Sequence, residues 1–268
     1  ATIAHFTVEK FSEMLIPFPS HQEQIAIADY LDRETAKIDA LIEKKERLLD
    51  LLALRRQALI SQVVTKGLNP DAPTKSSGVE WVGDIPKHWK ILPLKNIFEA
   101  ISSGTTPNTT ADKYYNGDIP WVTTSELRET VITRTDKQLT NLALRDYSAL
   151  KIYPPNTLLV AMYGATIGRV GILGISASVN QACCALANAI NSNFKFIFYC
   201  LIGGRDWLIS LASGGGQPNI NQEKIRSFLI PTPSLEEQRA IADYLDKKTE
   251  QIDRLIEKVK EAITLLQK

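Results

Sequence analysis

The sequence predicts an α+β fold, in which one mixed α/β domain lies between two long helices that pair like a coiled coil. Two observations lead to this prediction. One stretch occurs twice, because residues 19–45 and 233–259 align throughout and share the string AIADYLD, with Tyr30 matching Tyr244. The segment between the copies, residues 67–230, has no second copy and contains short apolar runs bounded by turn residues, which favour strands.

Residues 1–19 precede the first copy. A short apolar piece within them ends in two prolines, which predicts an extended segment. The alignment continues here, since residues 15–17 match residues 229–231. We therefore interpret residues 1–19 as the last piece of a preceding domain, of the same kind as the domain that follows.

The first long helix is expected over residues 20–66. Ser20 and Glu23 stand at the spacing of a capping box, in which the hydroxyl accepts a first-turn N–H and the carboxylate reaches back to the cap. Gly67 and Pro70 end the pattern. At ~1.5 Å per residue the helix is ~65 Å long. That length favours paired helices over two ordinary amphipathic helices packed on a common core.

The second long helix is expected over residues 234–268, where Ser234 and Glu237 repeat the capping-box spacing. In both copies apolar residues recur as one narrow stripe, with charges of both signs on the remaining faces. The residues expected to pair the helices are Ile27, Leu31, Ile38, Leu41, Leu48, Leu52, Ile241, Leu245, Ile252, Leu255, Val259 and Leu266.

Between the helices, residues 67–78 form a polar linker and the mixed domain occupies residues 79–233. Trp81 and Trp89 near its start are expected to anchor its base. The strands expected next are at residues 119–122, 156–162 and 179–186, after a strand or short helix at residues 94–101. A tight turn with a return strand is expected at residues 163–172, a helix broken at Gly203-Gly204 at residues 193–209, and a flexible loop at residues 213–219.

Composition and charge set few limits on function. The net charge of +1 is by itself weak evidence for nucleic-acid binding. The three cysteines, Cys183, Cys184 and Cys200, stand at no metal or disulfide spacing, so we expect buried thiols and a reducing, cytoplasmic environment. No apolar run is long enough to span a bilayer.

The motifs of catalysis are missing from the sequence. Residues 164–168 are not a dinucleotide-binding fingerprint, and the glycines at residues 214–216 lack the Gly-Lys-Ser/Thr of a phosphate loop. The histidines, His5, His21 and His88, are far apart. There is no G-x-S-x-G elbow, and no carboxylate cluster suggests a nuclease. We therefore predict a binding protein with no catalytic residues, no metal site and no cofactor.

Several stretches together give the chain a resemblance to a known family. The pattern PxPSxxEQxxIAxYLDxxTxxID occurs in both copies, and the domain opens with WVGDIPKHWKILPLK. Its centre holds YGATIGRVGI and the pair Asn180-Gln181, and SGGGQPNINQEKI precedes the second helix. On these motifs, which cover nearly the whole chain, it resembles the specificity (S) subunit of a type I restriction–modification enzyme.

The resemblance implies that recognition of DNA and catalysis belong to different subunits. Such subunits alternate two target-recognition domains with two long helices, which pack antiparallel and hold the two halves of a split DNA site a fixed distance apart. They are not catalytic. They dock methyltransferase (M) subunits, which methylate adenine with S-adenosylmethionine, and through these the restriction (R) subunits that cut unmethylated DNA. For this chain the resemblance implies double-stranded DNA and M subunits as partners.

The chain departs from this pattern, because it holds one recognition domain, residues 79–233, and a second helix shorter than the first. Two interpretations stay open. The chain is a fragment of a longer subunit, or it is a half-subunit that forms a self-dimer and reads a palindromic site.

DNA contacts are expected mainly from two loops, residues 102–113 and 123–134, because motifs shared by subunits of different specificity cannot encode that specificity. The residues best suited to bidentate contacts with bases are Arg128, Arg134, Asn108 and Gln138. The remaining expected contacts are Ser102, Ser103, Thr105, Thr106, Lys113, Thr123, Thr124, Tyr163, Thr166, Arg169 and Arg205.

A second hypothesis is a coiled-coil scaffold or adaptor that makes no sequence-selective DNA contact. A third, an enzyme fragment acting on nucleotides, is disfavoured by the missing phosphate and cofactor motifs. Replacing Arg128 and Arg134 together separates the first two hypotheses, because only a DNA reader loses selectivity when they are removed.

Overall fold

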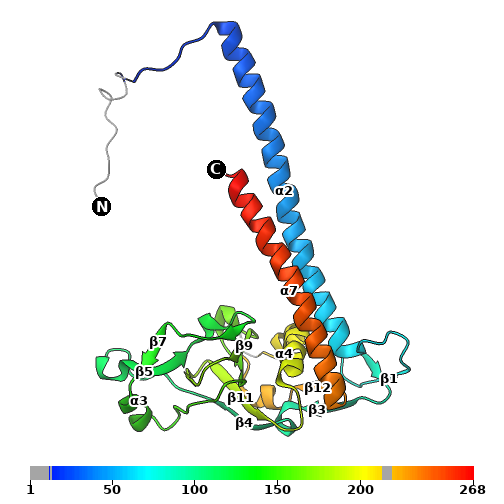
Figure 1. Cartoon of the computed structure of the whole chain (residues 1–268). Helices are drawn as coiled ribbons and strands as arrows, with labels where there is room; N and C mark the ends of the chain where they lie inside the picture. The colour runs from blue at the N-terminus through cyan, green and yellow to red at the C-terminus, as the bar shows by residue number, and fades with distance from the viewer. Residues whose placement is uncertain (1–11, 13, 213–218) are drawn as a thin grey trace. The chain divides into compact units, whose positions relative to one another are not determined.

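The computed structural model describes residues 12, 14–212 and 219–268. These residues form two compact units: unit 1 comprises the described residues up to Leu51 together with Ile256–Lys268, and unit 2 is Leu52–Leu255. Two long helices, α2 (His21–Lys66) and α7 (Leu235–Leu266), contribute residues to both units (Figure 1). The α+β fold class predicted from the sequence is confirmed.

Some sequence predictions fall outside the described residues. They include His5, most of the segment at residues 1–19, and residues 213–218 of the predicted loop. Residues 14–20 have no regular secondary structure. Among the described residues, no helix combines the length and the apolar composition that crossing a membrane requires.

The two long helices begin with related but different contacts. At the start of α2, Glu23 N donates to Ser20 Oγ at 3.4 Å, and Glu23 Oε2 accepts from Ser20 N at 2.9 Å, so the predicted capping box is confirmed. The Ser20 hydroxyl, which donates to Glu23 Oε2 at 2.6 Å, and then the Ser20 amide hold the pKa of the Glu23 carboxyl below its usual value. At the start of α7, Glu237 N donates to Ser234 Oγ at 3.2 Å. The Glu237 carboxylate accepts from Trp89 Nε1 at 3.0 Å, so it ties α7 to the domain.

In unit 1, the first part of α2 exposes its apolar stripe. Ile27 and Leu31 are 51% and 52% exposed, whereas Val259 of α7 is buried. The described residues therefore leave most of this stripe uncovered. The exposed members of the predicted stripe in unit 1 are Ile27, Leu31, Ile38, Leu41 and Leu48.

Unit 2 is built on a five-stranded sheet in the order β4-β11-β8-β9-β6. Its neighbours pair antiparallel, except that β6 and β9 are parallel. The strands are β4 (Phe98–Ser103), β6 (Val131–Ile132), β8 (Leu158–Ala161), β9 (Val170–Leu173) and β11 (Cys183–Ala189). The middle strands β8 and β9 are buried at every position, which explains why they are continuous apolar runs in the sequence.

The two faces of this sheet contribute to two apolar clusters. Leu158 and Val160 pack in the cluster that includes helix α4 (Phe194–Gly203), whereas Leu159 and Ala161 belong to the cluster on the other face. This alternation is the two-residue period of a strand. The cysteines are buried free thiols in these clusters, and burial raises the pKa of the Cys184 thiol to about 12.

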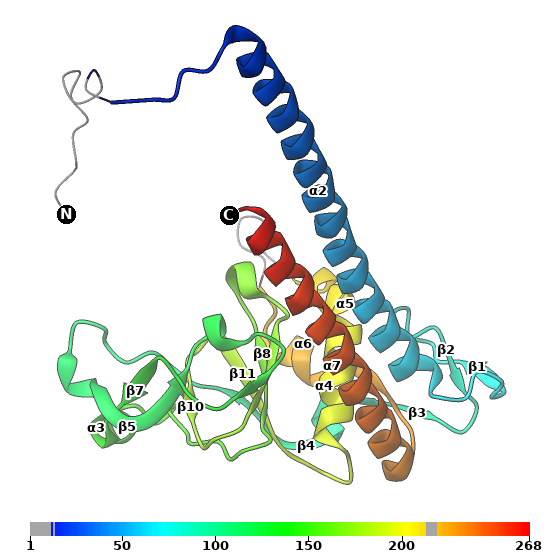
Figure 2. The same ribbon diagram turned by 45° about the horizontal axis from the view of Figure 1, so that its top comes forward.

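Three smaller sheets complete unit 2. A three-stranded sheet in the order β10-β5-β7 carries its own small apolar cluster with helix α3 (Asn141–Asp146). Strands β5 and β7 of this sheet lie at the end of unit 2 remote from α4 (Figure 2). The strands of the smaller sheets are β5 (Tyr115–Val122), β7 (Lys137–Leu139) and β10 (Ser178–Val179), then β3 (Lys90–Pro93) with β12 (Leu229–Thr232), and β1 (Thr74–Ser76) with β2 (Asp84–Pro86).

Most of the predicted elements are present, and the exception has a simple cause. The strand predicted at residues 179–186 is wrong as a single element, because Asn180 and Gln181 separate β10 and β11, which belong to different sheets. Residues 94–101 contain both alternatives, a 3₁₀ turn and β4. The predicted helix over residues 193–209 breaks at the glycine pair as expected. The remaining helices and turns are α5 (Arg205–Ser210), α6 (Gln222–Arg226), η1 (Leu94–Asn96), η2 (Asp112–Tyr114), η3 (Thr124–Glu126) and η4 (Gly164–Thr166).

The ends of the long helices within unit 2 are part of its core. Ile60 and Val64 of α2 share one apolar cluster with Ile241 and Leu245 of α7. The helices run antiparallel here, because Arg56 of α2 pairs with Asp253, whereas residues further along α2 lie near the start of α7. Trp89 is fully buried, as predicted for an anchor of the base. Trp81 stacks on Phe228 with ring centroids 5.5 Å apart.

Candidate nucleic-acid interface

The predicted loop at residues 102–113 is fixed by hydrogen bonds to remote segments. Ser102 Oγ lies 2.7 Å from Tyr153 Oη, and the amide of Asn108 donates to Tyr147 Oη at 3.0 Å. Thr106 Oγ1 donates to the side-chain oxygen of Gln181. The loop therefore has a defined conformation, although it lacks regular secondary structure over most of its length.

The Asn180-Gln181 pair organises the start of this loop. The carbonyl of Asn180 accepts from the amide of Gly104 at 3.3 Å, and the Asn180 amide donates to Val122 at 3.0 Å. A Cβ atom at Gly104 would lie 1.7 Å from the Val179 carbonyl oxygen, so this close approach requires glycine. These contacts give the pair a structural role at the start of the loop.

The predicted loop at residues 123–134 is held at both ends by one carboxylate. Glu126 Oε2 accepts from the amide of Thr123 at 2.6 Å, and Glu126 Oε1 accepts from the amide of Asp136 at 3.0 Å. Thr123 and Glu126 form a capping box around η3. Within this frame Arg128 is exposed, with its Nε donating to the Ser125 carbonyl at 3.3 Å.

The middle of the same loop is held by ion pairs. Glu129 Oε2 lies 3.0 Å from Arg56 Nη1, and Glu129 Oε1 lies 3.5 Å from Arg205 Nη1. Arg205, expected from the sequence to contact DNA, thus faces a carboxylate and has a side chain that is only 30% exposed. Arg134 is exposed and forms no ion pair with any described residue.

The two loops begin near each other, because Asn180 hydrogen-bonds both Gly104 and Val122, and a small pocket lies between the first loop and β7. A pocket of about 240 Å³ is lined by Thr109 and Asp112 of the first loop and by Asp136 and Gln138, which follow the second loop. Gln138 of β7 pairs with Pro120 of β5 and is exposed. The tertiary structure therefore places Gln138 of β7 beside the first loop, which also carries Asn108.

The predicted contacts at residues 163–169 belong to a separate turn. Tyr163 is 41% exposed, and Thr166 Oγ1 donates to its carbonyl at 3.4 Å. A Cβ atom at Gly168, which has a φ of +73°, would lie 3.2 Å from Arg205 Cγ, so the turn packs closely on α5. Arg169 is half-buried in this turn.

The remaining predicted contacts are accessible to different degrees. Lys113 is exposed and places its Nζ atom 4.8 Å from the Tyr114 ring centroid, a cation–π distance. Ser103, Thr105 and Thr124 are half-buried. Within the described ranges, no group of three His, Cys, Asp or Glu side chains lies close enough to hold a metal ion.

Sequence reasoning missed the acidic residues that shape the interface. The signal for Glu126 was present, because it stands three residues after Thr123 at capping-box spacing. No local signal pointed to Glu129, whose partners Arg56 and Arg205 are remote in the sequence.

Comparison with known proteins gives a consistent result. The model of the family described as "Type I restriction modification DNA specificity domain" matches residues 86–265. The chain is 30% identical over 192 residues to the type I restriction enzyme MjaIX specificity subunit of Methanocaldococcus jannaschii, covering 70% of this chain and 43% of that protein. It is 24% identical over 272 residues to the EcoR124I/EcoR124II specificity subunit of Escherichia coli, covering 97% and 62%. The chain thus spans about half the length of the curated relatives it matches.

Solved structures share the fold. The crystal structure of the HsdS subunit from Thermoanaerobacter tengcongensis aligns with a TM-score of 0.56 and 18% identity, over 99% of this chain and 60% of that one. A chain from a structural study of assembly and conformational transition in the type I R-M system aligns with a TM-score of 0.60 and 21% identity, over 88% and 55%.

Proposed function

The chain belongs to the family of type I restriction–modification DNA specificity domains, and on this premise we propose that it reads one half of a bipartite DNA site for a methyltransferase. In this proposal the chain is not catalytic, and the residues that methylate or cut DNA lie in other subunits. Its recognition domain contacts double-stranded DNA, and its long helices hold that domain at a fixed distance from a second one.

The observation that supports DNA reading is the pair of neighbouring loops at residues 102–113 and 123–134. Hydrogen bonds fix both loops, so little conformational entropy is lost when they bind a ligand. The exposed side chains on these loops and on the adjacent β7 include Asn108, Arg128, Arg134 and Gln138. Guanidinium groups suit guanine and carboxamide groups suit adenine in the major groove, so this set fits base-edge contacts.

The small net charge bears on affinity. The 31 Lys and Arg residues are nearly balanced by 30 Asp and Glu, so the chain has little net positive charge to attract phosphates, and M subunits that close around DNA would supply most of the neutralisation. Isolated chain should therefore bind DNA weakly, with a shallow dependence on salt concentration.

The repeat supports a bipartite arrangement. In the second copy, Asp246 accepts hydrogen bonds from Lys195 at 2.5 Å and Tyr199 at 2.7 Å, and Ile241 and Leu245 are fully buried. The same residue types occupy the aligned positions of the first copy, where the apolar ones are exposed. The first copy therefore carries the docking surface for a second recognition domain. The six aligned pairs are Gln24 and Gln238, Ile27 and Ile241, Ala28 and Ala242, Leu31 and Leu245, Asp32 and Asp246, and Thr35 and Thr249.

A surface groove on the first copy also supports docking of a second recognition domain. Pro19, Ala26, Tyr30 and other residues of the first copy line an open groove of about 360 Å³. Its lining includes Glu23, whose counterpart Glu237 is engaged by Trp89 in the second copy. A second recognition domain would fill the groove with an equivalent aromatic side chain.

A self-dimer of this chain is the alternative way to complete the site. Lys195 and Tyr199 of the recognition domain are already engaged by Asp246 and Thr249 of the same chain. A second copy would therefore cover the first repeat through other contacts, or by exchanging helices between chains.

In either form, M subunits dock on the outer helix faces and the base of the recognition domain, and R subunits join through them. The free, buried cysteines suit a cytoplasmic location.

A selection experiment tests the proposal. The chain is assembled with an M subunit of its type I system and incubated with a random-sequence duplex library, and the retained DNA is sequenced. A DNA reader should enrich one short motif, or two motifs at a fixed spacing when a second recognition domain is present. An unenriched pool from a folded, assembled complex would support the scaffold hypothesis instead.

A further inference from the structure

A partly buried ionic junction joins the candidate DNA-reading loop to the long helices. We propose that Glu129 is a positioning residue for DNA recognition, and that Arg56 of α2 holds it so that the 123–134 loop keeps a fixed orientation to the helices. This inference rests on the proposed function, since it assigns a role to residues behind the same DNA-reading loop.

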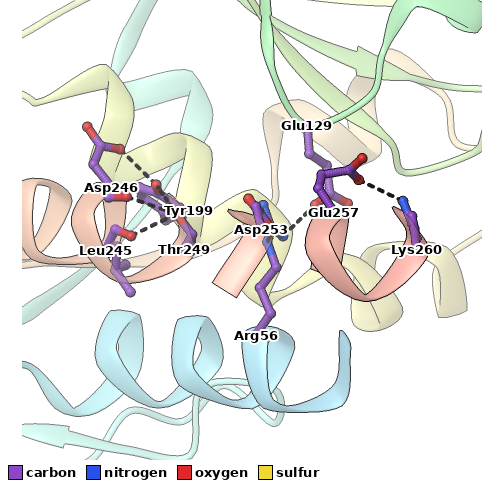
Figure 3. Close-up of polar contacts among 9 residues, drawn as sticks. All are labelled: Arg56, Glu129, Tyr199, Leu245, Asp246, Thr249, Asp253, Glu257 and Lys260. Carbon is purple, nitrogen blue, oxygen red and sulfur yellow. Dashed lines mark hydrogen bonds and ion pairs between the residues drawn. The ribbon is translucent and has the colours of Figure 1, made fainter. Parts of the chain in front are cut away.

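Three elements meet at Arg56. Figure 3 shows its side chain extending from α2 toward Asp253 of α7 and toward Glu129. Arg56 Nη1 lies 3.0 Å from Glu129 Oε2, and Arg56 Nε lies 3.0 Å from Asp253 Oδ1. The side chains of Arg56 and Glu129 are 17% and 23% exposed, so solvent screens their attraction less than at an open surface. One guanidinium therefore links both helices to the loop.

The backbone of Glu129 indicates that its side chain is required there. Its φ is +58°, in the left-handed region where glycine is the favourable residue. Its amide donates to the Val170 carbonyl at 2.9 Å, which fixes the loop against β9. A glutamate in a conformation that favours glycine costs free energy, and the two arginine contacts offset that cost.

The second arginine extends the junction to a neighbouring motif. Arg205 Nη1 lies 3.5 Å from Glu129 Oε1, and Arg205 packs beneath Gly168 of the 163–169 turn. The Glu129 carboxylate thus joins the loop to α2 through Arg56 and to α5 through Arg205, and α5 supports the 163–169 turn. Glu129 also lies in the loop that carries Arg128 and Arg134, two of the proposed base-reading residues.

This geometry predicts a loss of selectivity more than a loss of binding. Base-edge hydrogen bonds require accurate placement of donors, whereas phosphate attraction tolerates small displacements. Loosening the loop should therefore lower the preference for the correct sequence while leaving non-selective, salt-sensitive binding in place.

The test uses the chain assembled with its M subunit and a duplex selected by the wild-type complex from a random library. Affinities for this duplex and for a scrambled duplex give the selectivity. Glu129→Gln should reduce selectivity about tenfold, the loss typical of one base contact, while affinity for the scrambled duplex stays within about twofold. Arg56→Gln should have the same effect, and the double variant should lose little more than either single variant, because the residues act together.

Matched variants separate positioning from stability. Arg254→Gln removes an exposed ion pair on α7, Arg254 Nη2 to Glu250 Oε1 at 2.6 Å, and should leave selectivity unchanged. Glu129→Gly relieves the backbone but removes the carboxylate, so it should melt near the wild-type temperature and still lose selectivity. Retained selectivity in Glu129→Gln and Glu129→Gly, with both proteins folded, would overturn the inference. Equal affinity of the wild-type complex for both duplexes would instead refute the proposed function itself.

Discussion

At the scale of single residues, carboxylates organise the candidate interface, although basic and amide groups are its expected DNA contacts. Glu126 joins the two ends of the 123–134 loop through the amides of Thr123 and Asp136. Glu129 joins its middle to Arg56 and to Arg205. The residues proposed to contact DNA and the residues that hold the loop in place are therefore different sets. A basic residue that pairs internally, as Arg205 does, has less freedom to reach a phosphate than an exposed one on the same surface.

The exposed arginines of the loop give a prediction at this scale. Replacing Arg128 and Arg134 together by glutamine should lower the selectivity of the assembled complex by about 1–3 kcal/mol for each base that the variant no longer reads. Because both side chains are exposed, the melting temperature of the chain and its binding to the M subunit should not change. Fluorescence anisotropy with selected and scrambled duplexes measures the first effect, and thermal unfolding measures the second. Unchanged selectivity in a folded, assembled variant would favour the scaffold hypothesis.

At the scale of elements, the same sequence occurs in two environments. The string AIADYLD lies near the start of α7, where the mixed domain buries Ile241, Ala242 and Leu245, and near the start of α2, where all seven residues are exposed. Helix formation is identical in both copies, because capping and spacing are local properties. Burial differs, because residues of the mixed domain in unit 2 pack against the second copy on α7, whereas the first copy lies in unit 1 and its apolar residues are exposed.

The aligned aspartates turn this difference into a prediction. Asp246→Ala removes the acceptor for Lys195 and Tyr199, so the free energy of unfolding should fall by about 2 kcal/mol. Asp32→Ala is the matched control, because Asp32 is exposed and the change in helix propensity is the same. It should change the free energy of unfolding by less than ~0.5 kcal/mol. Urea unfolding of both variants checks this, and equal effects would contradict the assignment of the two copies.

At the scale of the whole molecule, the exposed first copy predicts an assembly. Leu31 is 52% exposed, so Leu31→Glu should leave the melting temperature of the isolated chain unchanged and prevent the first repeat from binding a second recognition domain. Leu245 is fully buried, so Leu245→Glu should prevent folding.

Light scattering of the chain, alone and with an M subunit, measures the assembly. A dimer or a two-to-two complex that Leu31→Glu dissociates would indicate a working half-subunit. A monomer that binds one M subunit, and whose mass Leu31→Glu does not change, would indicate that the second recognition domain belongs to a longer chain. A dimer unaffected by Leu31→Glu would show that the first repeat is not the docking surface.

The sequence predicted the periodic and locally capped parts of this protein well. Both long helices, the buried strands β8 and β9, and the break in the helix at residues 193–209 follow from hydrophobic period, capping residues and glycine. It failed at Asn180 and Gln181, because an apolar run that changes sheets has the same local pattern as one continuous strand. Trp89 as an anchor was predicted, but its hydrogen bond with Glu237 was not.

The amino-acid sequence by itself determined the internal repeat, the helices, the fold class and the likeness to specificity subunits, since all of these are local patterns or motifs. Only the tertiary structure decided which copy of the repeat is buried, how hydrogen bonds fix the two loops, and which arginines are engaged in ion pairs. The physical reason is that burial and ion pairing depend on distance in space. Arg56 and Glu129 lie far apart along the chain, and no local pattern encodes the 3.0 Å contact between them.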